Sequence, residues 1–205
     1  MSTSTSTEAP ERPRGWRHRI AMIAALALTA TLAFVLYRSW ASTSSEMTPG
    51  QVRAAVGTQL VSAMEHATPA DHAAHGHYDV GGTTKVLCTV EVLGYEPADA
   101  TDTRQVTRSY ANHQCAVSDN GRPWEYAVKT SGLLIATGQP PVVQVVAEGA
   151  DYAGRVRAAA IPAQYLDKAL ATSISQQALT DLRARFDVSV KEFWAAFKAS
   201  NPPAG

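Results

Sequence analysis

The stretch Ser118–Pro123, SDNGRP, contains the strongest turn signal in the chain. A type I′ turn places two consecutive residues at positive φ, and Asn120-Gly121 is the kind of pair that adopts this conformation most readily. Pro123 then falls at a non-hydrogen-bonded position, where its missing N–H is not needed. The turn predicts a hairpin with one apolar face, in which Cys115 lies opposite Tyr126, Val117 opposite Trp124 and His113 opposite Val128.

A preceding strand, over residues 84–95, is predicted from alternation, and its register from the two cysteines. Cys88 falls on the valine face of this strand. Placing Cys88 opposite Cys115 in an antiparallel pair aligns the rest, with Val86 opposite Val117 and Val90 opposite His113. His113 is then either a satisfied core histidine or the floor of a pocket. The other face of the sheet receives the row Glu91, Asn112 and Lys129, which suits solvent.

Helices are predicted both before and after the strands along the chain. Thr48 can cap a helix that runs to about Ala67, because Gln51 can reach back to Thr48 and Pro49 fits the first helical position. An apolar residue recurs every four positions along it and predicts a buried stripe: Val52, Val56, Leu60 and Met64.

Beyond the third strand, which should continue to about Thr137, residues 142–147 predict a fourth strand. This strand is β-branched on both faces, so we expect it to be central or covered on both sides. Helical segments should follow over residues 151–161 and 163–171, and a last helix should begin near residues 173–175. Aromatic residues line one face of that last helix and form either a packing surface or a partner-binding surface: Phe186, Phe193, Trp194 and Phe197.

The stretch Ile20–Tyr37, IAMIAALALTATLAFVLY, carries no charge and predicts a transmembrane helix. Basic residues on its amino-terminal side predict a cytoplasmic N-terminus and an extracytoplasmic C-terminal domain, and tryptophans flank it at interface positions. The alternative is a signal peptide cleaved after Ala41, but the apolar run is longer than is usual for one. The residues that carry this topology are Arg12, Arg14, Arg17, Arg19, Trp16 and Trp40.

The domain organisation follows from this anchor. Residues 1–19 form a disordered basic tail, 20–37 the anchor and 38–47 a linker. Residues 48–200 form one α+β domain and 201–205 a disordered end. The predicted fold is an antiparallel sheet of about four strands packed by N- and C-terminal helices, with the helices on one face of the sheet.

Cys88 and Cys115 are the only cysteines in the chain, and both follow the predicted anchor. Because that compartment is oxidising and the chain has no CxxC motif, we expect a structural disulfide. The alternative is a pair of buried free thiols.

A histidine-rich segment follows the first predicted helix and suggests a second type of site. Neutral imidazoles bind zinc or copper, and a neighbouring aspartate, Asp71 or Asp79, can complete the coordination. The spacing fits no zinc motif, and a polar loop with solvated histidines is the simpler interpretation. The candidate ligands are His72, His75, His77 and Asp79.

Charge and motif content limit the function. The net charge is zero, but the chain after residue 40 is mildly acidic, which argues against nucleic-acid binding. No motif typical of a nucleophile, a catalytic metal or a phosphate loop is present, so the sequence predicts no enzyme. Lipid and protein partners in the cell envelope are expected instead.

In size and element order, the chain resembles the single-pass accessory proteins of bacterial secretion, conjugation and envelope transport. These proteins carry a sheet-and-helix domain of the nuclear-transport-factor-2 or cystatin kind, and no motif of this chain supports the analogy residue by residue. We therefore predict a noncatalytic, membrane-anchored interaction domain. The alternative is an extracytoplasmic ligand- or metal-binding sensor module that uses the histidine-rich segment.

Overall fold

The computed structural model describes residues 46–76 and 84–201. The predicted basic tail, anchor and most of the linker lie outside the described residues, as do the topology residues Arg12, Arg14, Arg17, Arg19, Trp16 and Trp40. Within the described ranges, no helix has the length and apolar character needed to cross a bilayer.

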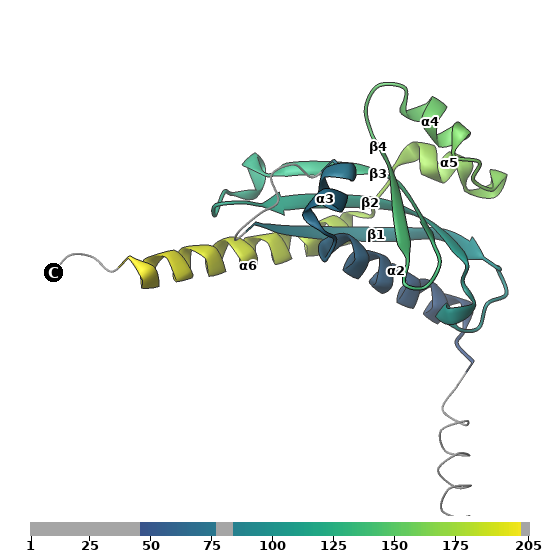
Figure 1. Cartoon of the computed structure of the whole chain (residues 1–205), viewed down its shortest axis with the longest axis horizontal. Coiled ribbons are helices and arrows are strands. Elements are labelled where there is room, and N and C mark those ends of the chain that lie inside the picture. The colour runs from purple at the N-terminus through teal and green to yellow at the C-terminus, as the bar shows by residue number, and fades with distance from the viewer. Residues whose placement is uncertain (1–45, 77–83, 202–205) are drawn as a thin grey trace, which may run out of the picture. The chain divides into compact units, whose positions relative to one another are not determined.

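The centre of the domain is a four-stranded antiparallel meander (Figure 1). Neighbours in sequence are neighbours in the sheet, in the order β1-β2-β3-β4. Helices precede and follow the sheet in the chain, so the predicted α+β class is confirmed. The strands are β1 (Lys85–Glu96), β2 (Arg108–Ser118), β3 (Val128–Thr137) and β4 (Val142–Ala147).

The predicted register of β1 and β2 is confirmed. Cys88 lies opposite Cys115, and the two form a disulfide. Val86 lies opposite Val117, and Val90 opposite His113. The register shifts once, between Val92 and Gly94, where a bulge that the sequence did not predict ends the regular alternation.

The predicted register of β2 and β3 is wrong by four residues. Asn120 and Gly121 do adopt positive φ values, of 49° and 65°, but strand pairing does not resume directly after the turn. A 3-10 helix, η2 (Trp124–Tyr126), intervenes, and Cys115 lies opposite Thr130 instead of Tyr126. A shift by an even number of residues leaves each side chain on its expected face of the sheet, so the predicted apolar face is still correct.

The valine face of the sheet packs on the first helix of the domain, α2 (Pro49–Glu65). The predicted capping box is present, because the Thr48 side chain accepts from the Gln51 N–H and the Gln51 side chain accepts from the Thr48 N–H. The predicted stripe is buried, with each member at most 3% exposed: Val52, Val56, Leu60 and Met64. Two short helices complete this half of the chain, α3 (Pro69–Ala74) and η1 (Thr103–Gln105).

Helices cover the opposite face as well, so the prediction of helices on one face only is wrong. Leu133 and Ile135 on this face pack in a second apolar core with residues of the later helices. Asn112, expected in a solvent-facing row, is fully buried and donates hydrogen bonds to the carbonyls of Lys168 and Ser173. The helices of this core are α4 (Tyr152–Ala158) and α5 (Ala163–Ala171), and the last helix, α6 (Gln176–Ser200), packs on β1 and β2.

The fourth strand has the predicted bounds, and of the two expected environments the central position is not found. It forms an edge of the sheet, and Val142 is 72% exposed. The alternative, cover on both faces, is found: Val143 and Val145 pack against the core beside α2, and Val146 is buried in the second core. The helix that follows ends at Ala158, before the Ile161 that we expected.

Candidate functional site

The C-terminal half of α6 extends past the end of the sheet (Figure 1). This part of the helix carries a group of aromatic side chains. We call Phe193, Trp194 and Phe197 the aromatic surface. Trp194 is 44% exposed and Phe197 is 49% exposed. The ring of Trp194 meets Phe193 and Phe197 edge to face, at centroid distances of 5.5 and 5.6 Å. The three rings therefore support one another while leaving apolar area open to solvent.

The turn between β2 and β3 holds this surface in place. The indole N–H of Trp194 donates a 3.0 Å hydrogen bond to the carbonyl of Gly121. A Cβ at Gly121 would lie 2.5 Å from a ring carbon of Phe193 and 2.6 Å from the indole nitrogen, so glycine allows the close approach. Glycine is therefore needed at position 121 for two reasons. The first is the close approach of the α6 rings, and the second is the positive φ of 65° that the turn requires. The sequence predicted only the second.

Next to the rings, a pocket of about 270 Å³ opens between the turn and α6. Ser118, Gly121 and Phe193 are among the residues that line it. An exposed ion pair between Lys85 and Glu192, at 2.9 Å, belongs to its lining. Apolar rings beside a polar, charged recess are typical of a protein-binding surface, which combines an apolar centre with a polar rim.

Not all of the predicted partner residues lie on this surface. Phe186 is fully buried and packs edge to face on Trp124 of η2, at a centroid distance of 5.2 Å. Its role is to attach α6 to the sheet. Tyr126 of η2 is 75% exposed, whereas the sequence pattern places it in a strand opposite Cys115.

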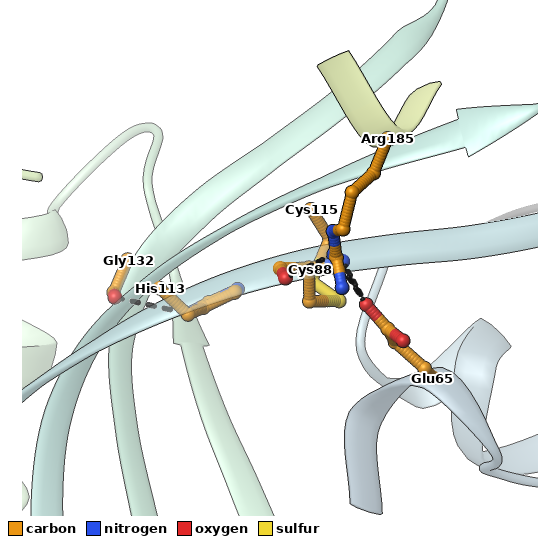
Figure 2. The surroundings of a disulfide bond; sticks show 6 residues. All are labelled: Glu65, Cys88, His113, Cys115, Gly132 and Arg185. Carbon is orange, nitrogen blue, oxygen red and sulfur yellow. Dashed lines mark hydrogen bonds and ion pairs between the residues drawn. A yellow bond between two sulfur atoms is a disulfide. The ribbon is translucent and has the colours of Figure 1, made fainter. Parts of the chain in front are cut away.

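Next to the disulfide, Glu65 of α2 and Arg185 of α6 form a polar clamp on the backbone of Cys88 (Figure 2). Glu65 of α2 accepts a hydrogen bond from the backbone N–H of Cys88, at 2.7 Å. Arg185 of α6 donates to the Cys88 carbonyl and also forms a 2.7 Å ion pair with Glu65. Both free backbone groups of Cys88 at the outer edge of β1 are thereby satisfied. The clamp fixes α2, β1 and α6 relative to one another and stabilises the frame from which the aromatic surface projects.

The histidine-rich segment is partly helical rather than a solvated loop. His72 lies in α3 and His75 follows at its C-cap, and both are buried. Burial, followed by the nearby His75, lowers the pKa of His72 below its ordinary value. The other two proposed ligands, His77 and Asp79, lie outside the described residues. Among the residues that the structure does describe, no group of three or more His, Cys, Asp or Glu side chains is arranged to hold a metal ion.

His113 is the most deeply buried titratable side chain of the sheet. Its Nδ1 lies 3.0 Å from the carbonyl of Gly132 on the neighbouring strand (Figure 2). Burial lowers the pKa of His113 to about 4, opposed by the hydrogen bond to Gly132. Its zero exposure agrees with a core histidine, but this histidine is only half satisfied, because its Nε2 has no hydrogen-bond partner among the described residues. It remains neutral at physiological pH.

The comparisons with known proteins supply no family. No protein-family model, no curated protein and no solved structure matches this chain. What the domain can do therefore follows from its own geometry. Its large exposed apolar side chains include Trp194 and Phe197 on α6 and Val142 on β4, and such side chains are suited to contact with another macromolecule.

Proposed function

We propose that this protein is a noncatalytic, membrane-anchored domain that binds a protein partner outside the cytoplasm. In this proposal it is an accessory component of a bacterial cell-envelope or transport complex. The observation that carries the proposal is the aromatic surface of α6. Aromatic residues, Trp and Phe among them, are enriched in the cores of protein–protein interfaces, and here Trp194 and Phe197 are about half exposed.

The arrangement of these rings supports binding more than chance exposure. Single exposed apolar residues are normal on protein surfaces and need no explanation. Trp194 and Phe197 are instead in mutual contact, and the hydrogen bond from Trp194 to Gly121 holds the indole in one position. A surface that is ordered before binding loses less conformational entropy when the partner arrives.

The membrane anchor is part of the proposal and is supported by the sequence alone. Ile20–Tyr37 is uncharged, and four arginines precede it within eight residues. This asymmetry favours a cytoplasmic N-terminus, with the described domain on the opposite side of the membrane. A disulfide within the domain agrees with an oxidising compartment.

A matched pair of variants on α6 tests the proposal. Phe197 and Val188 are 49% and 52% exposed, and nine residues at about 100° each place them on opposite sides of the helix. We expect a partner protein to co-purify with the tagged full-length wild type and with Val188→Lys. Phe197→Lys should reduce its recovery roughly tenfold, because a charged side chain would be buried in the interface without a partner.

Two results would contradict the proposal. One is that no protein co-purifies with the wild type from cells of the source organism. The other is that Phe197→Lys and Val188→Lys reduce recovery equally, which would indicate that the aromatic surface has no special role.

A further inference from the structure

The outer edge of β4 offers backbone hydrogen-bonding groups that β3 does not use. The carbonyl of Ala147 accepts a hydrogen bond from Arg155, at 2.7 Å, and so points away from β3, whereas the N–H of Glu148 donates to Ser131 next to β3. Backbone groups alternate between the two sides along an antiparallel strand. The N–H and carbonyl groups of Val143 and Val145 therefore point outward.

The two edges of the sheet differ in how they are protected. On β1, Glu65 and Arg185 occupy the outward groups of Cys88, and Arg53 donates to the Val92 carbonyl. On β4, within the described residues, only the Ala147 end carries such a side chain. The ten residues 138–147, GQPPVVQVVA, contain no charge. An uncharged, β-branched edge strand without clamps is the type of edge that pairs with another strand.

We propose that the partner at this edge is a second copy of the same chain, paired antiparallel through β4 about a two-fold axis at Gln144. In this register Val143 lies opposite the partner's Val145, and Val145 opposite the partner's Val143. The outward groups of these residues then form four hydrogen bonds. The two exposed Gln144 side chains lie directly opposite each other, and an amide can both donate to and accept from an identical amide.

The ends of this ladder agree with the same register. Beyond Val145, Ala147 would lie opposite the partner's Pro141, which has no N–H to donate. The Ala147 carbonyl needs no such donor, because Arg155 already satisfies it. The ladder therefore ends at the position where the strand carries its own cap. A strand from an unrelated protein would match this pattern only by coincidence, whereas a second copy matches it by symmetry.

The pairing also covers the most exposed aliphatic side chain of the strand. Val142 is 72% exposed and would lie opposite the partner's Val146. Beside Val146, a groove of about 470 Å³ runs between β4 and α4, and Ala158, Ala159 and Arg155 contribute to its lining. Each copy thus presents a valine to a groove that the other copy supplies, which is the reciprocity that a two-fold interface requires.

Cysteine cross-linking of the full-length protein tests this register. Gln144→Cys adds the only free thiol to a chain whose two native cysteines form a disulfide. Opposed residues at a non-hydrogen-bonded position are close enough for a bridge. The control is Gln164→Cys, an exposed position on α5. We expect disulfide-linked dimer from Gln144→Cys in roughly tenfold excess over the control, because pairing concentrates the thiols. Equal yields from both variants, or dimer from neither, would overturn the proposal.

A second pair of variants, made in the Gln144→Cys background, separates strand pairing from collision. Val143→Pro removes an outward backbone N–H that β3 does not use. Val143→Ala also shortens the valine side chain but keeps this backbone N–H. Val143→Pro should lower the cross-linked fraction roughly tenfold through the loss of two hydrogen bonds, while Val143→Ala retains it. Phe197→Lys should leave the cross-link unchanged, and its loss in that variant would assign the dimer to the aromatic surface instead. If Val143→Pro fails to fold, the comparison of Gln144→Cys with Gln164→Cys still tests the proposal by itself.

Discussion

Acid should destabilise this domain through His113. Burial lowers the pKa of this histidine to about 4 in the folded protein, from an ordinary value of 6.5. The unfolded chain therefore binds a proton more readily than the folded one. The contribution of neutral His113 to the free energy of unfolding is therefore fully present above pH 6.5 and is lost as the pH falls toward 4. Between pH 7 and 4.5, this linkage removes about 2 kcal/mol from the free energy of unfolding.

The charged and titratable groups around His113 leave this sign unchanged. His75 lowers its pKa further, and Glu148 raises it by a smaller amount. Elsewhere in the domain, Asp71 and Asp102 remain charged between pH 7 and 4.5, because hydrogen bonds from Thr68 and Arg104 lower their pKa values. His72, whose pKa is also lowered by burial, adds to the loss in the same direction.

Urea unfolding at pH 7 and pH 4.5 measures the effect, in the wild type and in His113→Leu. The leucine variant has its own stability at pH 7, but it cannot titrate at this position. We expect it to lose about 2 kcal/mol less than the wild type between the two pH values. If both proteins lose the same free energy of unfolding, the burial of a neutral His113 does not contribute to acid sensitivity and the reasoning is wrong.

Three further predictions concern the turn, the disulfide and the topology. Gly121→Ala should destabilise the domain by about 1–2 kcal/mol in thermal unfolding, because the new Cβ would clash with the α6 rings and because alanine is strained at a positive φ. The control is Gly50→Ala, whose new Cβ has no neighbour within 4 Å. Changing Cys88 and Cys115 together to serine should cost about 3.5 kcal/mol for a closed loop of 27 residues, and an unchanged denaturation midpoint would contradict this. A reporter enzyme that is active only outside the cytoplasm should work when fused after Gly205, and activity of a cytoplasm-only reporter there would reverse the topology.

The parts of the fold that the sequence could predict depended on local rules or on a covalent pair. The cap at Thr48 needs only four residues, and it was placed correctly. Cys88 and Cys115 constrain two distant positions to lie opposite each other, which fixes the register of β1 and β2 for every other pair up to the bulge. The even spacing of apolar residues then assigned the faces.

The errors arose where distant contacts decide. Trp124 leaves the strand because it packs on Phe186, about sixty residues later in the chain, and a turn signal contains no information about that contact. Asn112 appeared suited to solvent, but the carbonyls of Lys168 in α5 and of Ser173 in the α5–α6 connection accept hydrogen bonds from it. The valines of β4 resembled those of a central strand, yet strand order depends on the whole topology.

The candidate site was predicted in part for the same reason. The helical spacing placed Phe193, Trp194 and Phe197 near one another, but spacing alone could not show which rings the sheet would cover. Phe186 is buried because η2 covers it, while the last turns of α6 extend beyond the strands (Figure 1). The contact between Trp194 and Gly121 joins two elements that are more than seventy residues apart.

Site-specific photo-cross-linking tests the central claim, that the aromatic surface binds a partner protein. A photoreactive phenylalanine analogue would replace Phe197 in the full-length protein in cells of the source organism, and Val188 in a matched variant. We predict a discrete adduct with a different protein at position 197 and none at position 188 after irradiation. The absence of an adduct at 197, or the same adduct at both positions, would contradict the claim that this surface is a binding site.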